Sequence, residues 1–163
     1  RCALRLSALG FNLLGWSRGP NEMSGVDCSY GAERLDSILQ ASTIAVVLLP
    51  LTEQTVNLMD KVTFNAMPSG SFLINCSRGE LVVEEDLVAA LDNERLAGAT
   101  LDAFREEPLP HGSPLWRHPK VRVTPHIASL SAPGTAAMIL ADQVRRARNR
   151  QRLTDTINIE HGY

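Results

Sequence analysis

The sequence predicts an α/β protein in which a parallel β-sheet carries helices on both of its faces. Short apolar runs that are typical of strands alternate with segments whose apolar residues recur at helical spacing, and this alternation indicates βαβ units. The run at residues 42–49 is apolar without alternation. We therefore expect it to form a central parallel strand that is covered on both faces.

The first quarter of the chain predicts two helices and two strands. Residues 1–9 are rich in leucine and alanine and predict a helix that ends at Gly10. Residues 11–18 predict a strand, and residues 26–30 predict a short edge strand. Residues 32–40 place three apolar side chains at helical spacing and predict the next helix.

The middle of the chain repeats this pattern after the apolar run at 42–49. Thr52 and Asp60 can cap two short helical segments, because their side-chain oxygens can accept hydrogen bonds from free backbone N–H groups. Residues 71–75 predict a strand. Three acidic residues then open a helix at 84–91, where negative charge suits the positive end of the helix dipole.

Two further strands and a long helix complete the predicted fold. Residues 99–104 and 121–124 are apolar runs, and the proline-rich segment between them is too irregular for helix or strand. The last helix is expected to begin at residues 131–133, because proline is tolerated in a first helical turn. Its apolar stripe consists of Ala136, Ile139, Leu140 and Val144.

Composition narrows the class of protein. The 163 residues are 44% hydrophobic and 21% charged, which suits a globular domain with a sizeable core. The net charge of −2 gives no indication of a nucleic-acid partner, and no apolar run is long enough to span a bilayer. The three cysteines are widely spaced, which favours a reducing, cytoplasmic compartment. The histidines are not at metal-ligand spacing, so we expect no metal site.

Three polar residues follow the ends of three predicted strands. Arg78 follows the strand at 71–75, Glu107 lies just beyond residue 104, and His126 lies just beyond residue 124. The carboxyl ends of parallel strands form the edge where ligands bind in open α/β sheets. The alternative is that Glu107 and His126 are surface residues that never meet, and that Arg78 forms only a surface salt bridge.

These three residue types together suit one kind of substrate. An arginine can hold a carboxylate through two parallel hydrogen bonds. A histidine can transfer a proton near neutral pH, and a glutamate can orient its ring and favour its charged form. If the three side chains face one crevice, the sequence predicts acid/base chemistry on a molecule that has a carboxylate beside a carbonyl.

Three ordered motifs resemble the D-isomer-specific 2-hydroxyacid dehydrogenases. They are Asn-Cys-Ser-Arg-Gly at residues 75–79, Leu-Asp-Ala-Phe-Arg-Glu-Glu-Pro-Leu-Pro at 101–110, and Thr-Pro-His-Ile-Ala at 124–128. The segment at 113–119 and the closing Gly-Tyr at 162–163 are most similar to the branch that reduces glyoxylate and hydroxypyruvate. The resemblance implies a Rossmann-like fold, an NAD(P)-dependent oxidoreductase that forms a D-2-hydroxyacid from a small 2-oxoacid, and a homodimer.

The resemblance also assigns roles to the three strand-end residues. It implies that Arg78 binds the substrate carboxylate, that His126 is the acid/base, and that Glu107 pairs with it. One alternative is a non-catalytic dinucleotide-sensing or partner-binding module, because the resemblance extends to transcriptional co-repressors. Another is an inactive truncated fragment. The presence of all three residues favours the enzyme, because a protein that only binds does not need the complete set.

The same resemblance implies the residues that bind the cofactor. At the end of the second family strand they are Trp16, Ser17 and Arg18. At the other strand ends they are Leu49, Pro50, Leu51, Thr55, Cys76, Ser77, Arg78, Asp102, His126 and Ala128. An acidic residue near Ser17 would select NAD by holding the ribose 2′-hydroxyl. Since none is present, we expect NADP, with NAD possible. The alternative is that Arg18 is merely solvated.

The sequence departs from the family pattern at its beginning. The family's first strand and its glycine-rich turn are absent, so residues 1–128 are expected to form an amino-terminally truncated NAD(P)-binding domain. Residues 129–163 are expected to form a helix and tail that would pack on an absent substrate domain. The strands at 11–16 and 44–49 should then either pair directly or take a strand from another chain or a preceding segment. The apolar stripe of the last helix should be exposed or covered by a partner.

Overall fold

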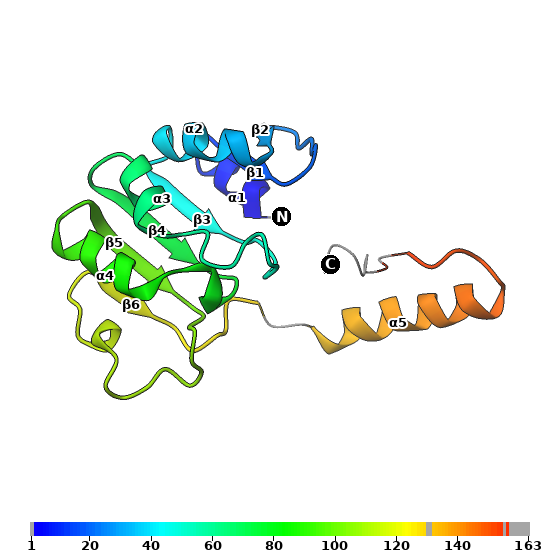
Figure 1. Cartoon of the computed structure of the whole chain (residues 1–163). Helices are drawn as coiled ribbons and strands as arrows, with labels where there is room; N and C mark the ends of the chain where they lie inside the picture. Colours follow the sequence, from blue (N-terminus) through cyan, green and yellow to red (C-terminus); the bar gives the residue numbers. More distant parts are fainter. Residues whose placement is uncertain (1, 130–131, 155, 157–163) are drawn as a thin grey trace.

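The computed structural model of the chain describes residues 2–129, 132–154 and 156 (Figure 1). The helices and strands follow one another in the order that the sequence predicted. In order they are α1 Cys2–Ala8, β1 Leu14–Ser17, β2 Asp27–Tyr30, α2 Leu35–Gln40, β3 Ile44–Val47, α3 Lys61–Ala66, β4 Ser71–Asn75, α4 Glu84–Asp92, β5 Leu96–Leu101, β6 Val121–Val123 and α5 Pro133–Arg148. Short 3₁₀ turns lie at Ala32–Arg34, Gly79–Leu81 and Pro114–Trp116.

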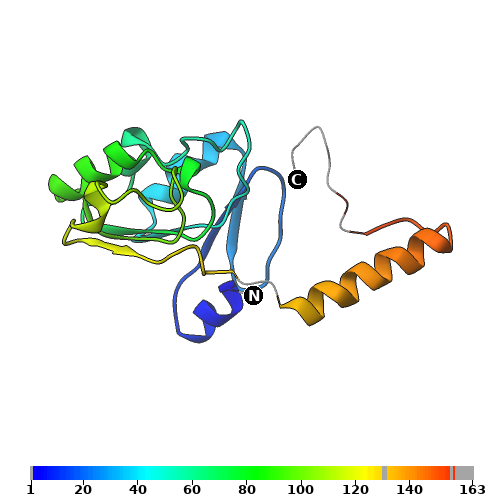
Figure 2. The same cartoon turned by 90° about the horizontal axis from the view of Figure 1, so that it is seen from below.

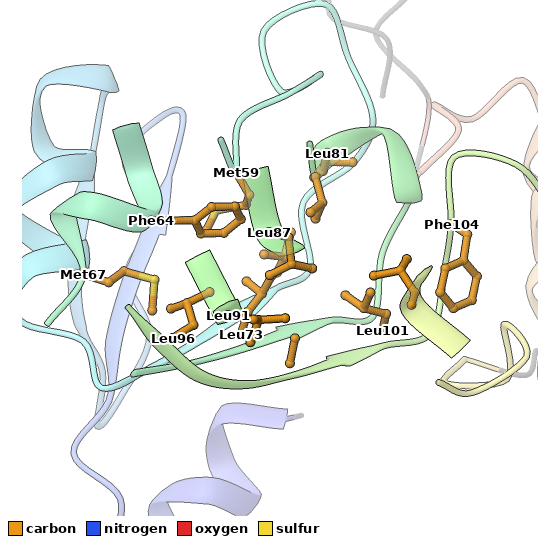
Figure 3. Close-up of a cluster of buried hydrophobic side chains, with 14 of the residues drawn as sticks. Met59, Phe64, Met67, Leu73, Leu81, Leu87, Leu91, Leu96, Leu101 and Phe104 are labelled. Atoms are coloured by element: carbon orange, nitrogen blue, oxygen red, sulfur yellow. The ribbon is translucent and has the colours of Figure 1, made fainter. Parts of the chain in front are cut away.

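The main sheet contains four parallel strands in the order β3-β4-β5-β6. Helices α3 and α4 pack on one face of this sheet, and α1 lies on the other side (Figure 3). This arrangement confirms the predicted α/β class with helices on both sides of a parallel sheet. Because β4, β5 and β6 are immediate neighbours, the residues that follow their carboxyl ends lie along one edge.

The hydrophobic core fills the space between the sheet and helices α3 and α4 (Figure 3). In β4 the inward positions alternate with more exposed ones, as the two-residue period of a strand requires. The completely buried leucines include Leu73 of β4, Leu87 and Leu91 of α4, and Leu96 of β5. The part of the chain that carries the three strand-end residues therefore rests on a well-packed base.

The helices of this layer begin where the sequence predicted. Asp60 caps α3: its carboxylate accepts hydrogen bonds from the backbone N–H groups of Val62 and Thr63, and Thr63 bonds back to the cap. Such a capping box satisfies backbone donors that have no partner within the helix. Helix α4 has three acidic residues in its first turn, and their negative charges interact favourably with the positive end of the helix dipole.

Strands β1 and β2 form a separate two-stranded parallel sheet. Among the described residues, β1 is paired only with β2, and β3 is paired only with β4. The direct pairing of β1 with β3, which was one of our two expectations, is therefore wrong. The strands therefore form two separate sheets, with the break between β1 and β3. Each of these two strands has one edge without a hydrogen-bonded partner strand among the described residues.

The prediction that residues 42–49 form a central strand covered on both faces is also wrong. β3 is an edge strand, and the side chains of Ile44 and Val46 on its second face are 42% and 39% exposed. Val47, which points to the core, is 5% exposed. An apolar run shows that its side chains favour burial. It does not show whether the helices or strands that would bury them lie within the same chain.

The observed strands are also shorter than, or shifted from, the predicted ones. β1 begins at Leu14 instead of residue 11. β5 begins at Leu96, because this residue pairs with Ser71, and it ends at Leu101 instead of residue 104. Asp102 lies just beyond the strand: its backbone N–H still donates to the backbone oxygen of Asn75 at 2.9 Å, and its side chain bonds to the loop that follows β6.

Helix α5 extends away from the sheet (Figure 2). None of its side chains is buried. The expected exposure of its apolar stripe is confirmed: Ile139, Leu140 and Val144 are 49%, 66% and 52% exposed. Residue 131, where we expected the helix to begin, and the motif at 162–163 lie outside the described residues. No described helix has the length and apolar character needed to cross a bilayer.

Two leucine substitutions test this division between packed and unpacked helices. Leu87→Ala should lower the free energy of unfolding of the 163-residue chain by about 2–5 kcal/mol, because it opens a cavity in the core. Leu140→Ala should change it by less than about 0.5 kcal/mol, because that side chain is exposed. Denaturant titration followed by circular dichroism measures both. Equal losses would show that α5 packs in solution.

Candidate active site

Loops that follow β4, β5 and β6 carry the three predicted catalytic residues. Arg78 lies three residues beyond β4, Glu107 lies six residues beyond β5, and His126 lies three residues beyond β6. The three strands are adjacent and parallel, so these loops lie together at the carboxyl edge of the sheet. The fold thus brings near one another residues that are up to 48 positions apart in the sequence.

The side chains of Glu107 and His126 are in direct contact. His126 Nδ1 lies 2.8 Å from one carboxylate oxygen of Glu107 and 3.1 Å from the other. The approach that we predicted for these two residues is confirmed, and the alternative in which they never meet is wrong. With Nδ1 facing the carboxylate, the other ring nitrogen, Nε2, is directed away from Glu107. The His126 and Glu107 side chains are 42% and 38% exposed, so a small molecule can reach them.

The surroundings of Glu107 favour its ionised form. The hydrogen bond with His126 lowers the pKa of its carboxyl group most, followed by the hydrogen bond from the backbone N–H of Phe104 at 3.0 Å. The positive charges of His126 and Arg78 lower this pKa further. A charged Glu107 that faces Nδ1 of His126 fixes the orientation of the imidazole ring.

Asp102 anchors the loop that carries His126. The Asp102 side chain is only 2% exposed and accepts hydrogen bonds from the Thr124 hydroxyl at 2.5 Å and from the backbone N–H groups of Ile127 and Ala128 at 3.0 and 2.8 Å. Burial acts to raise the pKa of Asp102, but these hydrogen bonds outweigh burial and lower it. The buried carboxylate therefore fixes the loop on both sides of His126.

The backbone of His126 has a φ of 52°, in the left-handed region. A residue other than glycine in this conformation typically costs about 1–3 kcal/mol and is found where the surrounding structure imposes it. Here the His126 N–H donates to the backbone oxygen of Asp102 at 2.8 Å. The hydrogen bonds of the loop therefore hold the His126 backbone in this unfavourable conformation, and the backbone in turn sets the direction in which the imidazole extends.

Arg78 is placed by a turn that Asn75 organises. Asn75 is completely buried; its amide donates to the backbone oxygen of Arg78 at 2.9 Å, and its carbonyl accepts the N–H of Ser77 at 3.1 Å. The Arg78 guanidinium bonds to the backbone oxygen of Ser77 at 3.0 Å. Because the Arg78 residue is itself exposed, the remaining donors of its guanidinium are available to an anion.

Sequence reasoning did not identify Gly79, which allows two of the site loops to touch. A Cβ atom at Gly79 would lie 1.9 Å from the backbone carbon of Phe104 and 2.3 Å from the backbone nitrogen of Arg105. Only a residue without a side chain permits this approach. The glycine after Arg78 was a signal of close backbone contact, but the sequence did not show which segment it contacts. Thr124, which bonds to Asp102, was likewise not singled out.

The predicted cofactor residues at the main sheet lie beyond the carboxyl ends of all four strands, with Asp102 after β5, His126 and Ala128 after β6, and the others after β3 and β4. The Thr55 hydroxyl donates to the backbone oxygen of Pro50 at 2.7 Å and accepts the Thr52 N–H at 2.8 Å, so the loop at 49–55 is internally bonded. The Ser77 hydroxyl donates to the backbone oxygen of Leu49, which joins this loop to the turn that carries Arg78. Burial and the charge of Asp102 raise the pKa of Cys76, so its thiol stays protonated.

The three remaining cofactor candidates lie on the small sheet. The Trp16 ring N–H donates to the backbone oxygen of Gly31 at 2.8 Å, and the Ser17 hydroxyl donates to that of Gly19 at 2.8 Å. Arg18 follows β1 and is exposed. These residues thus end a strand that is not bonded to the main sheet in the described chain. The His, Cys, Asp and Glu side chains of the described chain form no cluster suited to a metal ion.

A parallel sheet with polar residues at its carboxyl edge places the chain in the class of open α/β domains that bind ligands at this edge, to which the dinucleotide-binding domains belong. Within that class, residues 1–128 match the family model of the NAD binding domain of D-isomer specific 2-hydroxyacid dehydrogenase. The chain belongs to this family.

Individual relatives extend beyond the length of this chain. A protein named glyoxylate/hydroxypyruvate reductase A from Salmonella paratyphi B is 39% identical over all 163 residues, which cover 52% of that protein. The chain therefore spans about half the length of the curated relatives it matches. A Xanthobacter autotrophicus family member solved in complex with NADPH and MES is 43% identical, with a TM-score of 0.95 over 99% of this chain and 66% of that one.

A further solved structure comes from Sinorhizobium meliloti. It is an NADPH-dependent glyoxylate/hydroxypyruvate reductase in complex with NADP and sulfate, 34% identical, with a TM-score of 0.93 over 99% of this chain and 52% of that one. Both structural similarities extend over nearly the whole of this chain.

The close contact at Gly79 predicts a large effect of one methyl group. Gly79→Ala should lower the free energy of unfolding by about 1–3 kcal/mol, because the backbone at Phe104 must move. Gly112→Ala is the matched control, since a Cβ there meets nothing within 4 Å, and it should stay within about 0.5 kcal/mol of the parent. Thermal unfolding of both variants measures the difference. Comparable stability of the two would contradict the contact.

Proposed function

We propose that this chain forms the nucleotide-binding part of an NADPH-dependent reductase that converts small 2-oxoacids of the glyoxylate or hydroxypyruvate type into D-2-hydroxyacids. The observation that carries the proposal is the contact between Glu107 and His126 beside Arg78 at the carboxyl edge of the sheet. Membership of the 2-hydroxyacid dehydrogenase family and the names of the relatives support it.

Arg78 is proposed to bind the carboxylate of the substrate. Its guanidinium is exposed at the site edge, and a planar guanidinium can hold a carboxylate through two parallel hydrogen bonds. The turn organised by Asn75 fixes the backbone from which Arg78 extends. A substrate held in this way has its 2-carbonyl group next to the carboxylate and within the reach of the neighbouring loop that carries His126.

His126 is proposed to protonate the carbonyl oxygen. Glu107 binds Nδ1, which leaves the proton on Nε2 for transfer to the substrate oxygen. The negative charge of Glu107 stabilises the imidazolium before the transfer. A nicotinamide cofactor, when bound, would supply the hydride for the carbonyl carbon. His126 gives up one proton, so the product is a neutral hydroxyl group, and His126 regains a proton from solvent.

The residues present fit a phosphorylated dinucleotide. The end of β1 offers the hydroxyl of Ser17 and the exposed guanidinium of Arg18, and no carboxylate occurs between Leu14 and Gly19. A hydroxyl and a cation suit a 2′-phosphate, whereas an acidic side chain would suit an unmodified ribose. The loop at 49–55, together with Ser77, Cys76, Asp102 and Ala128, would line the rest of the cofactor.

We further infer that the complete enzyme works in the cytoplasm as a homodimer. All three cysteines are free thiols, which supports a reducing compartment. The exposed apolar stripe of α5 supports a covering partner or domain in the complete protein, because such side chains favour burial. We propose that residues 129–163 pack on the substrate domain.

The proton transfer is tested by replacing His126 in a full-length protein that contains this chain. His126→Ala should lower kcat for glyoxylate or hydroxypyruvate reduction by roughly 10²–10⁴-fold, because general acid catalysis is lost. Arg78→Ala should raise KM and also lower kcat, because the same contact binds and positions the substrate. His111→Ala, which alters an exposed histidine in the loop between β5 and β6, is the control. Unchanged turnover by His126→Ala would rule out the assigned role.

Cofactor choice is tested at Arg18. The full-length protein should use NADPH with a kcat/KM roughly tenfold to a hundredfold above that for NADH, because a charge-assisted phosphate contact is worth about 1.5–3 kcal/mol. Arg18→Ala should reduce this ratio, mainly because it weakens the binding of NADPH and so lowers kcat/KM for that cofactor. Arg117→Ala, at an exposed arginine before β6, should leave the ratio unchanged. Equal use of both cofactors by the parent protein would contradict the inference.

A further inference from the structure

Arg105 makes several hydrogen bonds beside the site. Its Nε donates to the backbone oxygen of Val82 at 2.8 Å, and its terminal nitrogen donates to the backbone oxygen of Glu80 at 3.2 Å and to the side-chain oxygen of Asn57. Its backbone N–H donates to the carboxylate of Glu84 at 3.1 Å. The side chain is exposed, so these contacts do not serve to fill a hydrophobic core.

The partners of the guanidinium come from two other loops of the site. Glu80 and Val82 belong to the segment that follows Arg78, and Asn57 belongs to the segment that follows β3. These two segments are themselves joined, since the Asn57 N–H donates to the Glu80 backbone oxygen at 2.8 Å. Arg105 therefore connects the loop of Glu107 to both of them.

We propose that Arg105 is a positioning residue that holds Glu107 in its contact with His126. Glu107 lies two residues after Arg105, and its carboxylate accepts the N–H of Phe104, the residue just before Arg105. His126 is fixed separately, through the hydrogen bonds that its loop makes to Asp102. The distance between the two groups thus depends on how firmly the 104–107 segment is held, and Arg105 supplies the side-chain bonds that hold it.

The geometry requires an arginine instead of any cation. A guanidinium presents several N–H donors in one rigid plane and can reach the three oxygens together. A lysine ammonium is a single flexible point of charge and cannot reproduce that arrangement. The contact at Gly79 adds to the requirement, because the Phe104–Arg105 backbone lies directly against the segment to which the guanidinium bonds.

The chain offers a matched control in Arg95. Its guanidinium also bonds to two backbone oxygens, those of Phe64 at 3.3 Å and Asn65, but it precedes β5 at the opposite edge of the sheet. Arg95→Ala removes the same kind of contact and should destabilise the protein without affecting the site. Arg105→Ala and Arg105→Lys are then compared with it.

The first measurement is amide hydrogen exchange followed by NMR, which does not require activity. Arg105→Ala should speed exchange at Phe104, whose N–H binds Glu107, by about tenfold or more relative to the parent after correction for global stability. Arg105→Lys should behave similarly, and Arg95→Ala should show no such local change. Parent-like exchange at Phe104 in Arg105→Ala, or full restoration by lysine, would overturn the proposal.

The second measurement is steady-state kinetics in the full-length protein, and it rests on the proposed function. Arg105→Ala should lower kcat about tenfold, because loosened catalytic geometry costs rate, while KM for the 2-oxoacid changes less, since Arg78 remains. Arg95→Ala should keep the parent kcat. An unchanged kcat in Arg105→Ala would overturn the positioning role. If the parent protein reduces no 2-oxoacid, the proposed function fails, and hydrogen exchange still decides whether Arg105 holds Glu107.

Discussion

The buried carboxylate of Asp102 is the contact on which the geometry of the site depends. An ionised group under the surface is unfavourable unless donors compensate it, and here three donors do so: the Thr124 hydroxyl and the N–H groups of Ile127 and Ala128. All three donors belong to the loop that contains His126. The cost of burying Asp102 therefore imposes the path of that loop, including the left-handed backbone at His126.

The sheet and the loops make different contributions to the geometry of the site. The strand order β4-β5-β6 brings three loops to one edge, and the hydrophobic core between the sheet and helices α3 and α4 supports these strands. The loops are then fitted to one another by local contacts, such as the turn of Asn75 and the close approach at Gly79. Both contacts hold backbone atoms of the loops, so they fix the position of the backbone from which each functional side chain extends.

The sequence was sufficient to predict the helix and strand order, because buried strands and amphipathic helices have different periods. It also predicted that Glu107 and His126 meet, since both follow the carboxyl ends of strands. It could not show that Asp102 is the acceptor for the His126 loop, because those hydrogen bonds join residues 22 to 26 positions apart. It misplaced β3 at the centre of a continuous sheet, because an apolar run looks the same whether its neighbours are in the chain or not.

Within the part of the chain that the structure describes, β3 has one edge without a paired strand, and this edge bears on the solubility of the chain. An edge strand offers free N–H and C=O groups to any other extended polypeptide, and proteins commonly protect such edges with lysine or proline. Residues 44–49 contain neither, and Ile44, Val46 and Leu48 are all exposed. Until Pro50 ends this segment, β3 has the features of a template for intermolecular β-pairing. From these features we expect the isolated chain to aggregate through this strand at high concentration, and a companion segment that covers it would act as a solubilising cap.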